Sequence, residues 1–170
     1  MIGQLLFKTS IYLMKFKTGL GQDSHAFENN KKTLLLAGVD CMHAQGLRAN
    51  SDGDVVLHAL TNAVSSITGI NILGEKADYL CQQGIVDSRE YLKLALQDLN
   101  TWQVQHISIS IECLKPKISP FIIDMKKNIA KLFNISTDDI GITATTGEGL
   151  SAFGKGEGIQ VLCIISVLQP

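Results

Sequence analysis

An aspartate and a histidine, Asp23 and His25, lie two residues apart in the run GLGQDSHAF at 19–27. In an extended chain, residues i and i+2 point to the same face, so this pair would present a carboxylate and an imidazole side by side. A lone His58 follows within VVLHAL, on the expected buried side of a predicted helix. Two imidazole nitrogens and one carboxylate oxygen leave one position of a tetrahedral site open, which is typical of catalytic rather than structural zinc.

Each of these residues also has an ordinary structural explanation. A polar pair on a solvent-exposed strand face would account for Asp23 and His25 without any metal. A buried histidine that donates to a backbone carbonyl would account for His58. Asp54, one helical turn before His58, could orient the imidazole, or it could be a first-turn acid that interacts favourably with the helix dipole. For each of these residues, the sequence alone leaves the functional and the structural explanation open.

A second group of polar residues lies in ATTGEGLSAFGKGEG at 144–158. It combines Thr145, Thr146 and Glu148 with five glycines, which suits a turn whose backbone amides and hydroxyls approach an anion closely. A carboxylate beside a phosphate requires a cation between them, such as magnesium. The alternative is a flexible glycine loop between strands. The segment lacks the spacing of a Walker loop or a GxGxxG fingerprint.

Length, charge and cysteine content bound the class of protein. The chain has 170 residues, of which 45% are apolar, and this predicts a single domain over residues 14–170. Fifteen lysines and arginines nearly balance 16 aspartates and glutamates, so we expect no nucleic-acid partner and no membrane partner. The cysteines are far apart and form no CxxC pair, which argues against a disulfide framework or a cysteine zinc site and predicts a cytoplasmic protein.

The first residues of the chain are expected to lie outside this domain. Residues 1–13 carry apolar runs that Gln4, Lys8 and Thr9 interrupt, so they make a poor signal peptide and are too short to span a bilayer. Met14 is a candidate start of the protein. The preceding residues would then be a disordered or misassigned extension rather than a structured element.

The elements that must position these residues follow from hydrophobic periodicity. Strands are predicted at 15–27, in a short hairpin over 34–44, and at 104–114, 140–146 and 158–168. Helices are predicted at 54–68, 87–103 and 119–133, with a short helical piece in a loop at 70–86 and a turn or short helix start at 135–139. The last strand is apolar enough to be buried on both faces. Together they predict one mixed β-sheet covered by helices, an α/β (α+β) sandwich.

The order of these motifs resembles a known family. GLGQDSHAF, ANSDGDVVLHAL, DSRE, KPK and ATTGEGLSAFGKGEGI occur here in the order seen in the 2-C-methyl-D-erythritol 2,4-cyclodiphosphate synthase family of the non-mevalonate isoprenoid pathway. The resemblance runs from about Met14 to the end of the chain. It implies a lyase that cyclises 4-diphosphocytidyl-2-C-methyl-D-erythritol 2-phosphate and releases CMP. It also implies a homotrimer with active sites between neighbouring subunits.

The resemblance assigns roles to individual residues. Asp23, His25 and His58 match ligands of Zn²⁺ or another divalent transition metal, and Glu148 matches the ligand of Mg²⁺ or Mn²⁺. These residues and Thr146 would form the catalytic set. Cys113 to Lys117 would form the cytidine pocket. The full set of implied substrate contacts is Asn50, Ser51, Asp78, Cys113, Leu114, Lys115, Pro116, Lys117, Thr145, Thr146 and Lys155.

Several positions depart from the family's pattern. Asn50 stands where a histidine usually helps to position a phosphate, and an amide cannot carry charge near neutral pH. Asn71 stands where an aspartate often contacts the erythritol, and Asp78 is a weak substitute because the 70–86 loop lacks the family's usual run. Lys155 replaces an arginine that binds a diphosphate in the trimer cavity of some members, and it lacks the planar fork of arginine.

Two other functions are consistent with the same residues. One is a zinc-dependent phosphohydrolase, in which metal-bound water attacks a phosphate. The other is a non-catalytic protein that binds a nucleotide or an isoprenoid diphosphate, which Asn50 and the altered loop would allow. The cyclase is favoured, because a binding protein has little reason to retain an open zinc site beside a second cation-binding carboxylate.

Overall fold

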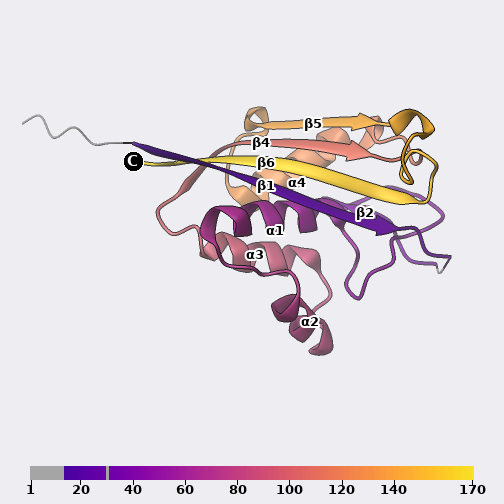
Figure 1. The fold of residues 1–170 in the computed structure, drawn as a ribbon, viewed down its shortest axis with the longest axis horizontal. Helices are drawn as coiled ribbons and strands as arrows, with labels where there is room; N and C mark the ends of the chain where they lie inside the picture. The colour runs from indigo at the N-terminus through magenta and orange to yellow at the C-terminus, as the bar shows by residue number, and fades with distance from the viewer. Residues whose placement is uncertain (1–13, 30) are drawn as a thin grey trace, which may run out of the picture.

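A four-stranded mixed sheet is the centre of the structure, a computed structural model that describes residues 14–29 and 31–170 (Figure 1). Its strands, in their order across the sheet, are β1 (Lys15–Ala26), β6 (Gly158–Gln169), β4 (Gln103–Glu112) and β5 (Ile140–Thr145). β6 runs antiparallel to β1 and β4, whereas β4 and β5 are parallel. The predicted mixed sheet is confirmed. The extension predicted for residues 1–13 lies outside the described residues.

Helices cover one face of this sheet. α1 (Val55–Thr68) packs against β1 and β6, α4 (Ile122–Phe133) packs against β5, and α3 (Ser88–Gln97) packs on α1. α2 (Glu75–Gln82) projects from the body of the molecule (Figure 1). The remaining elements are β2 (Leu35–Leu36), β3 (Val39–Asp40), and the 3₁₀ turns Ser119–Phe121, Thr137–Asp139 and Gly147–Gly149. The predicted α/β sandwich is therefore confirmed.

The predicted helix over 87–103 is too long. α3 ends at Gln97, and β4 already begins at Gln103. Asn100 between them has a φ of 52°, in the left-handed region that asparagine adopts more readily than most residues. Residues 98–101 therefore form a turn instead of continuing the helix. The short helical piece predicted within 70–86 is α2.

The prediction that the last strand is buried on both faces is wrong for the single chain. Alternate residues of β6, such as Val161 and Cys163, are buried under the helices. On the opposite face, Leu162 and Ile164 remain 40% and 44% exposed. In the part of the chain that the structure describes, no helix covers this second face (Figure 1). An apolar surface therefore remains on the open side of the sheet.

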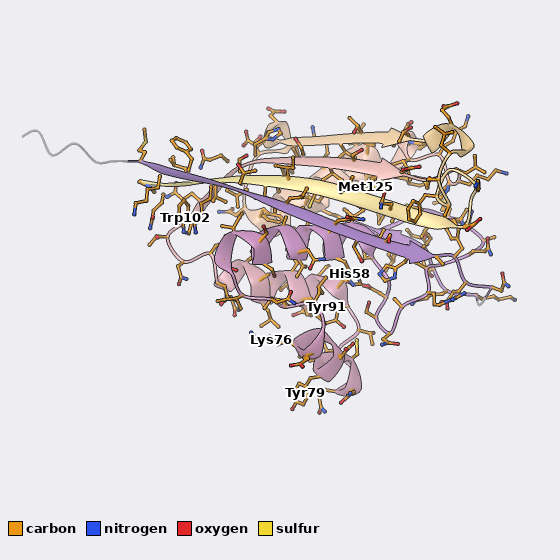
Figure 2. All side chains as sticks on the ribbon, in the orientation of Figure 1. His58, Lys76, Tyr79, Tyr91, Trp102 and Met125 are labelled. Atoms are coloured by element: carbon orange, nitrogen blue, oxygen red, sulfur yellow. The ribbon has the colours of Figure 1, made fainter. Side chains whose placement is uncertain are left out.

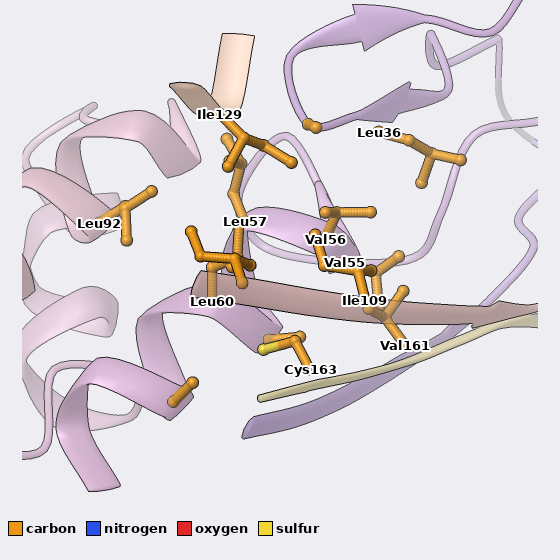
Figure 3. Close-up of a cluster of buried hydrophobic side chains, with 14 of the residues drawn as sticks. Leu36, Val55, Val56, Leu57, Leu60, Leu92, Ile109, Ile129, Val161 and Cys163 are labelled. Carbon is orange, nitrogen blue, oxygen red and sulfur yellow. The ribbon is translucent and has the colours of Figure 1, made fainter. Parts of the chain in front are cut away.

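The core lies between α1 and the sheet (Figure 3). Val56 and Leu60 of α1 are fully buried, in one cluster with Ile109 of β4 and Val161 of β6. Full burial of such a side chain stabilises the fold by about 1.5–3 kcal/mol. α1 is therefore firmly attached to the sheet, and a side chain in its first turn has a well-defined position.

Two glycines of β1 let α1 approach the strand closely. A Cβ atom at Gly21 would overlap the carbonyl oxygen of Ala59 on α1, and one at Gly19 would also overlap the helix backbone. Any larger residue at these positions would push α1 away from β1. Because side chains alternate along a strand, Asp23 and His25 share the face of these glycines. The close approach therefore places the first turn of α1 against that pair.

Neither a disulfide nor a membrane-crossing helix occurs among residues 14–29 and 31–170. All four cysteines are free. Burial raises the pKa of Cys113 to about 11 and that of Cys163 to about 12, so both thiols are neutral near pH 7 and act as small apolar packing groups. No described helix is long and apolar enough to cross a bilayer.

Candidate functional site

Three side chains that could bind a metal meet at the end of β1. Asp23 and His25 come from this strand. His58, which is labelled in Figure 2, comes from the first turn of α1. Asp23 Oδ2 lies 2.9 Å from both His25 Nε2 and His58 Nδ1, and the two nitrogens are 3.1 Å apart. The structure thus brings together the three residues that the sequence predicts as metal ligands.

The spacing of these atoms suits a divalent transition metal. In a tetrahedral zinc site with ligand distances of about 2.0–2.1 Å, the ligand atoms lie roughly 3.3 Å apart. The separations of 2.9–3.1 Å in this chain need only a small outward shift of the side chains to match that geometry. Three protein ligands leave a fourth position for an exchangeable group. Asp23, His25 and His58 therefore fit an open metal site.

The two histidines control the charge state of Asp23. Burial raises the pKa of this carboxyl group, but hydrogen bonds from His25 and His58, together with their charges, lower it by more. The resulting pKa of Asp23 lies well below its usual range. Asp23 is therefore ionised throughout the neutral pH range, which is the state in which a carboxylate binds a metal.

Ser88 holds the imidazole of His58 from its far side. His58 Nε2 lies 2.9 Å from the Ser88 hydroxyl and 3.3 Å from the Ser51 hydroxyl. The Ser88 hydroxyl donates to the carboxylate of Asp52, which also accepts a bond from the Ser88 amide at 3.0 Å. Because the Ser88 hydroxyl directs its proton to Asp52, its oxygen accepts a hydrogen bond from His58 Nε2. Nε2 therefore carries a proton, and Nδ1, which faces Asp23, is the nitrogen that would bind a metal.

The sequence analysis missed the pair formed by Ser88 and Asp52. Their residue types are typical of helix starts, so neither residue stands out in the sequence. The hydrogen bonds between them join residues 36 positions apart, which no local pattern predicts. The available signal was that both residues lie in runs shared with the family, DSRE and SDGD.

Asp54 caps α1 rather than orienting the imidazole of His58. Its carboxylate accepts hydrogen bonds from two amides in the first turn of α1 and from the amides of Ala37 and Gly38. Burial raises the pKa of Asp54 to about 6, although these amides act in the opposite direction. Of the two alternatives, the structure shows the interaction with the helix start.

Replacement of Ser88 by alanine is expected to weaken metal binding about 10- to 100-fold, because the His58 ring loses the acceptor that orients it. Competition of the protein with a chromophoric chelator for zinc measures this affinity. Ser65→Ala is the matched control, since the Ser65 hydroxyl is also buried on this side of the sheet but has no hydrogen-bond partner among the described residues. Equal zinc affinities of the two variants would show that Ser88 does not support the metal.

The metal ligands line a cavity of about 500 Å³. Asn50, Ser51 and Asp78, which the sequence predicts as substrate contacts, also line it. Its apolar wall includes Leu73, Ala77 and Tyr91 (Figure 2 labels Tyr91 near His58). A polar end beside an apolar wall suits a small polar molecule with a short hydrocarbon skeleton.

The other predicted site residues form a separate group at the ends of β4 and β5. The amide of Cys113 donates to the carbonyl of Thr145 at 3.1 Å, so the segment 113–117 lies beside the glycine-rich turn that contains Lys155. In this turn the Thr146 hydroxyl donates to the exposed carboxylate of Glu148 at 3.2 Å.

This second group is not part of the cavity at the metal ligands. Among the described residues that line that cavity, none belongs to 113–117 or to 144–158. The single chain therefore presents two separate sets of the predicted site residues. One set surrounds the metal position, and the other presents threonine side chains and a carboxylate to solvent.

Comparisons with known proteins find relatives over most of the chain. The model of the YgbB family matches residues 16–168. A 2-C-methyl-D-erythritol 2,4-cyclodiphosphate synthase of Chlamydia felis is 46% identical over 158 residues, which cover 91% of this chain and 90% of that protein. The protein of the same name from Chlamydia muridarum is 45% identical over 158 residues, covering 91% of this chain and 89% of that protein.

Solved structures show the same fold. The bifunctional IspDF of Campylobacter jejuni matches with a TM-score of 0.85 and 32% identity over 93% of this chain, which spans 43% of that longer protein. A 2C-methyl-D-erythritol-2,4-cyclodiphosphate synthase solved in its CDP-bound form matches with a TM-score of 0.79 and 27% identity. That match covers 89% of this chain and 99% of the other.

Proposed function

The chain belongs to the YgbB family, and from that premise we propose that it converts 4-diphosphocytidyl-2-C-methyl-D-erythritol 2-phosphate into 2-C-methyl-D-erythritol 2,4-cyclodiphosphate and CMP. The protein is then a phosphorus–oxygen lyase of non-mevalonate isoprenoid biosynthesis. The observation that carries this proposal is the convergence of Asp23, His25 and His58 beside a cavity, in a chain whose relatives carry that enzyme's name. Its free cysteines support a cytoplasmic location.

The proposed reaction needs a substrate that folds back on itself. An oxygen of the 2-phosphate attacks the β-phosphorus of the diphosphate and closes an eight-membered ring. The bond between the β-phosphorus and the bridging oxygen breaks, and CMP leaves with that oxygen. No covalent enzyme intermediate is required. The task of the protein is therefore to hold the attacking and leaving oxygens in line and to neutralise the phosphates.

We assign two cation sites to this task. Asp23, His25 and His58 would hold Zn²⁺ or another divalent transition metal, and Glu148 would hold Mg²⁺ or Mn²⁺. When bound, these cations supply Lewis-acid neutralisation of the crowded phosphate oxygens. The ionised Asp23 and the Nδ1 atom of His58 that faces it suit the first ion. The exposed carboxylate of Glu148, beside the Thr146 hydroxyl, suits a hard cation that takes oxygen ligands.

Hydroxyls and backbone groups would hold the rest of the substrate. Ser51 lines the cavity beside the metal ligands, where its hydroxyl can donate to a phosphate. The hydroxyls of Thr145 and Thr146 can donate to the nucleotide phosphates. The segment 113–117 would bind the cytidine through its backbone, and Lys117 would pair with a phosphate of the nucleotide.

We propose that the complete active site forms between subunits of a homotrimer. Within one chain, neither Glu148 nor the segment 113–117 lines the cavity at the metal ligands. A neighbouring subunit could supply this second set of residues. The open face of β6, where Leu162 and Ile164 are exposed, offers an apolar surface for contact around a threefold axis. Lys155, in the glycine-rich turn that precedes β6, is a candidate contact for an isoprenoid diphosphate in the trimer cavity.

A charge on the open face of β6 is expected to give inactive monomers. Ile164→Glu would place a charge in the proposed trimer contact, where the cost of burying it exceeds the energy of a single apolar contact. Analytical ultracentrifugation together with turnover measures both effects. Ile123→Glu on α4 is the matched control, since Ile123 is an exposed isoleucine of another surface. A wild-type protein that is a stable, active monomer would contradict the proposed assembly.

Product analysis tests the reaction itself. Purified protein is incubated with the diphosphocytidyl substrate, Zn²⁺ and Mg²⁺, and the products are followed by phosphorus NMR. A cyclic diphosphate together with CMP is the expected result. Linear hydrolysed products would instead indicate a phosphohydrolase. Tight CMP binding without turnover would indicate a binding protein.

A further inference from the structure

The cavity at the metal ligands contains one positively charged side chain, Arg48, to which the proposed function has so far given no role. Among the described residues that line it, Arg48 is the single lysine or arginine. The same lining carries the carboxylates of Asp23 and Asp78. Arg48 makes no ion pair with any residue in the part of the chain that the structure describes. Its guanidinium can therefore bind a ligand without first giving up a partner.

The backbone around Arg48 is held on two sides. The Arg48 amide donates to the carbonyl of Ala26 at 2.9 Å, next to the metal ligand His25 on β1. On the other side, the ammonium of Lys32 donates to three carbonyls of the same segment. These are the carbonyls of Leu47 at 3.1 Å, Ala49 at 3.2 Å and Ser51 at 2.7 Å. The segment is thus positioned before any ligand arrives, which reduces the entropy lost on binding.

The charges in this cavity would not favour a phosphate without Arg48. The carboxylates of Asp23 and Asp78 in this lining repel a negatively charged group. Asn50, in the same segment as Arg48, donates hydrogen bonds but brings no charge. A phosphate monoester carries about 1.5 to 2 negative charges at pH 7. The planar fork of an arginine binds such a group through two parallel hydrogen bonds.

We propose that Arg48 is a substrate-binding residue that takes the phosphate monoester of the substrate, on a small polyol whose carbon skeleton packs on the apolar wall of the cavity. This role of Arg48 rests on the proposed function. In that reaction the monoester is the attacking 2-phosphate, whereas the diphosphate lies between two esterified ends. Arg48 supplies the positive charge that Asn50 cannot.

The test compares two ligands that differ by one phosphate. One is the full substrate, for which kcat and KM are measured with Zn²⁺ and Mg²⁺. The other is the same diphosphocytidyl compound without its 2-phosphate, for which an inhibition constant is measured. Arg48→Ala is expected to lower kcat/KM about 10²-fold and to leave the inhibition constant within about twofold. Arg48→Lys, which keeps the charge but loses the fork, is expected to lose about 10-fold. The zinc content of both variants is expected to equal that of the wild type.

The other outcomes overturn the proposal. Unchanged kcat/KM in Arg48→Ala would show that Arg48 does not bind the substrate. Equal weakening of both ligands, or loss of zinc, would show that Arg48 supports the segment 47–51 instead of a phosphate. A wild-type protein that neither turns over the substrate nor binds the second ligand would overturn the proposed function as well, so the two failures are distinguishable.

Discussion

Replacement of His58 by alanine is expected to lower kcat by about 10³-fold or more, because a Lewis-acid cation contributes several kcal/mol to charge stabilisation in the transition state. Two protein ligands would remain, Asp23 and His25, and both come from one short stretch of β1. They cannot enclose an ion from opposite sides as the three-residue group can. The zinc content of the purified variant is therefore expected to fall together with its turnover.

Measurements on folding separate this effect from simple destabilisation. His58 lies at the edge of a cavity, so its removal leaves the core cluster of α1 and the sheet intact. The proposed trimer, if the wild type forms it, and the far-UV circular dichroism are expected to persist. His43→Ala is the matched control, because His43 packs against Phe27 and does not line the cavity. Near-normal turnover in His58→Ala would contradict the metal assignment.

Replacement of Glu148 by glutamine is expected to lower kcat/KM about 10²-fold at low Mg²⁺, because a neutral amide binds a hard cation much more weakly than a carboxylate does. Rising Mg²⁺ concentration should restore part of the activity. The variant should bind zinc normally, since Glu148 lies outside the cavity of the metal ligands. Its melting temperature should also be unchanged, because the exposed side chain makes one hydrogen bond, with Thr146.

The matched control for this experiment lies in the same loop. Glu157→Gln removes the same charge from an exposed carboxylate only a few residues away. Titration of activity with Mg²⁺ in both variants separates a specific ligand from a general loss of negative charge. If activity depended on Mg²⁺ in the same way in both variants, Glu148 would contribute only to the local electrostatic field.

Most helices and strands could be predicted because they depend on residues close in sequence. Alternation over 104–114 predicts β4, and helical spacing with a glycine stop predicts α1. The errors occur where contacts between distant residues decide. The end of α3 depends on where β4 must start, and the open face of β6 depends on which other elements cover the sheet. Neither the end of α3 nor the exposure of β6 can be predicted from a short stretch of sequence.

The candidate site shows the same division. Asp23 and His25 could be identified because two residues of a strand share a face by local geometry. His58 could be identified because an imidazole among apolar residues needs a partner. Ser88 and Asp52 could not be identified as supports for His58, since their types are equally typical of helix starts. Arg48 gave no signal, because an arginine in a predicted loop is most often solvated.

The amino-acid sequence by itself determined the sheet and helix inventory, the residue types of the metal group and the family of the chain. Only the tertiary structure decided that α1 packs directly onto the glycines of β1 and so brings His58 to within 2.9 Å of Asp23. It also decided that Glu148 and the segment 113–117 lie outside that cavity. The physical reason is that packing and long-range hydrogen bonds act between residues that are neighbours in space but distant in sequence.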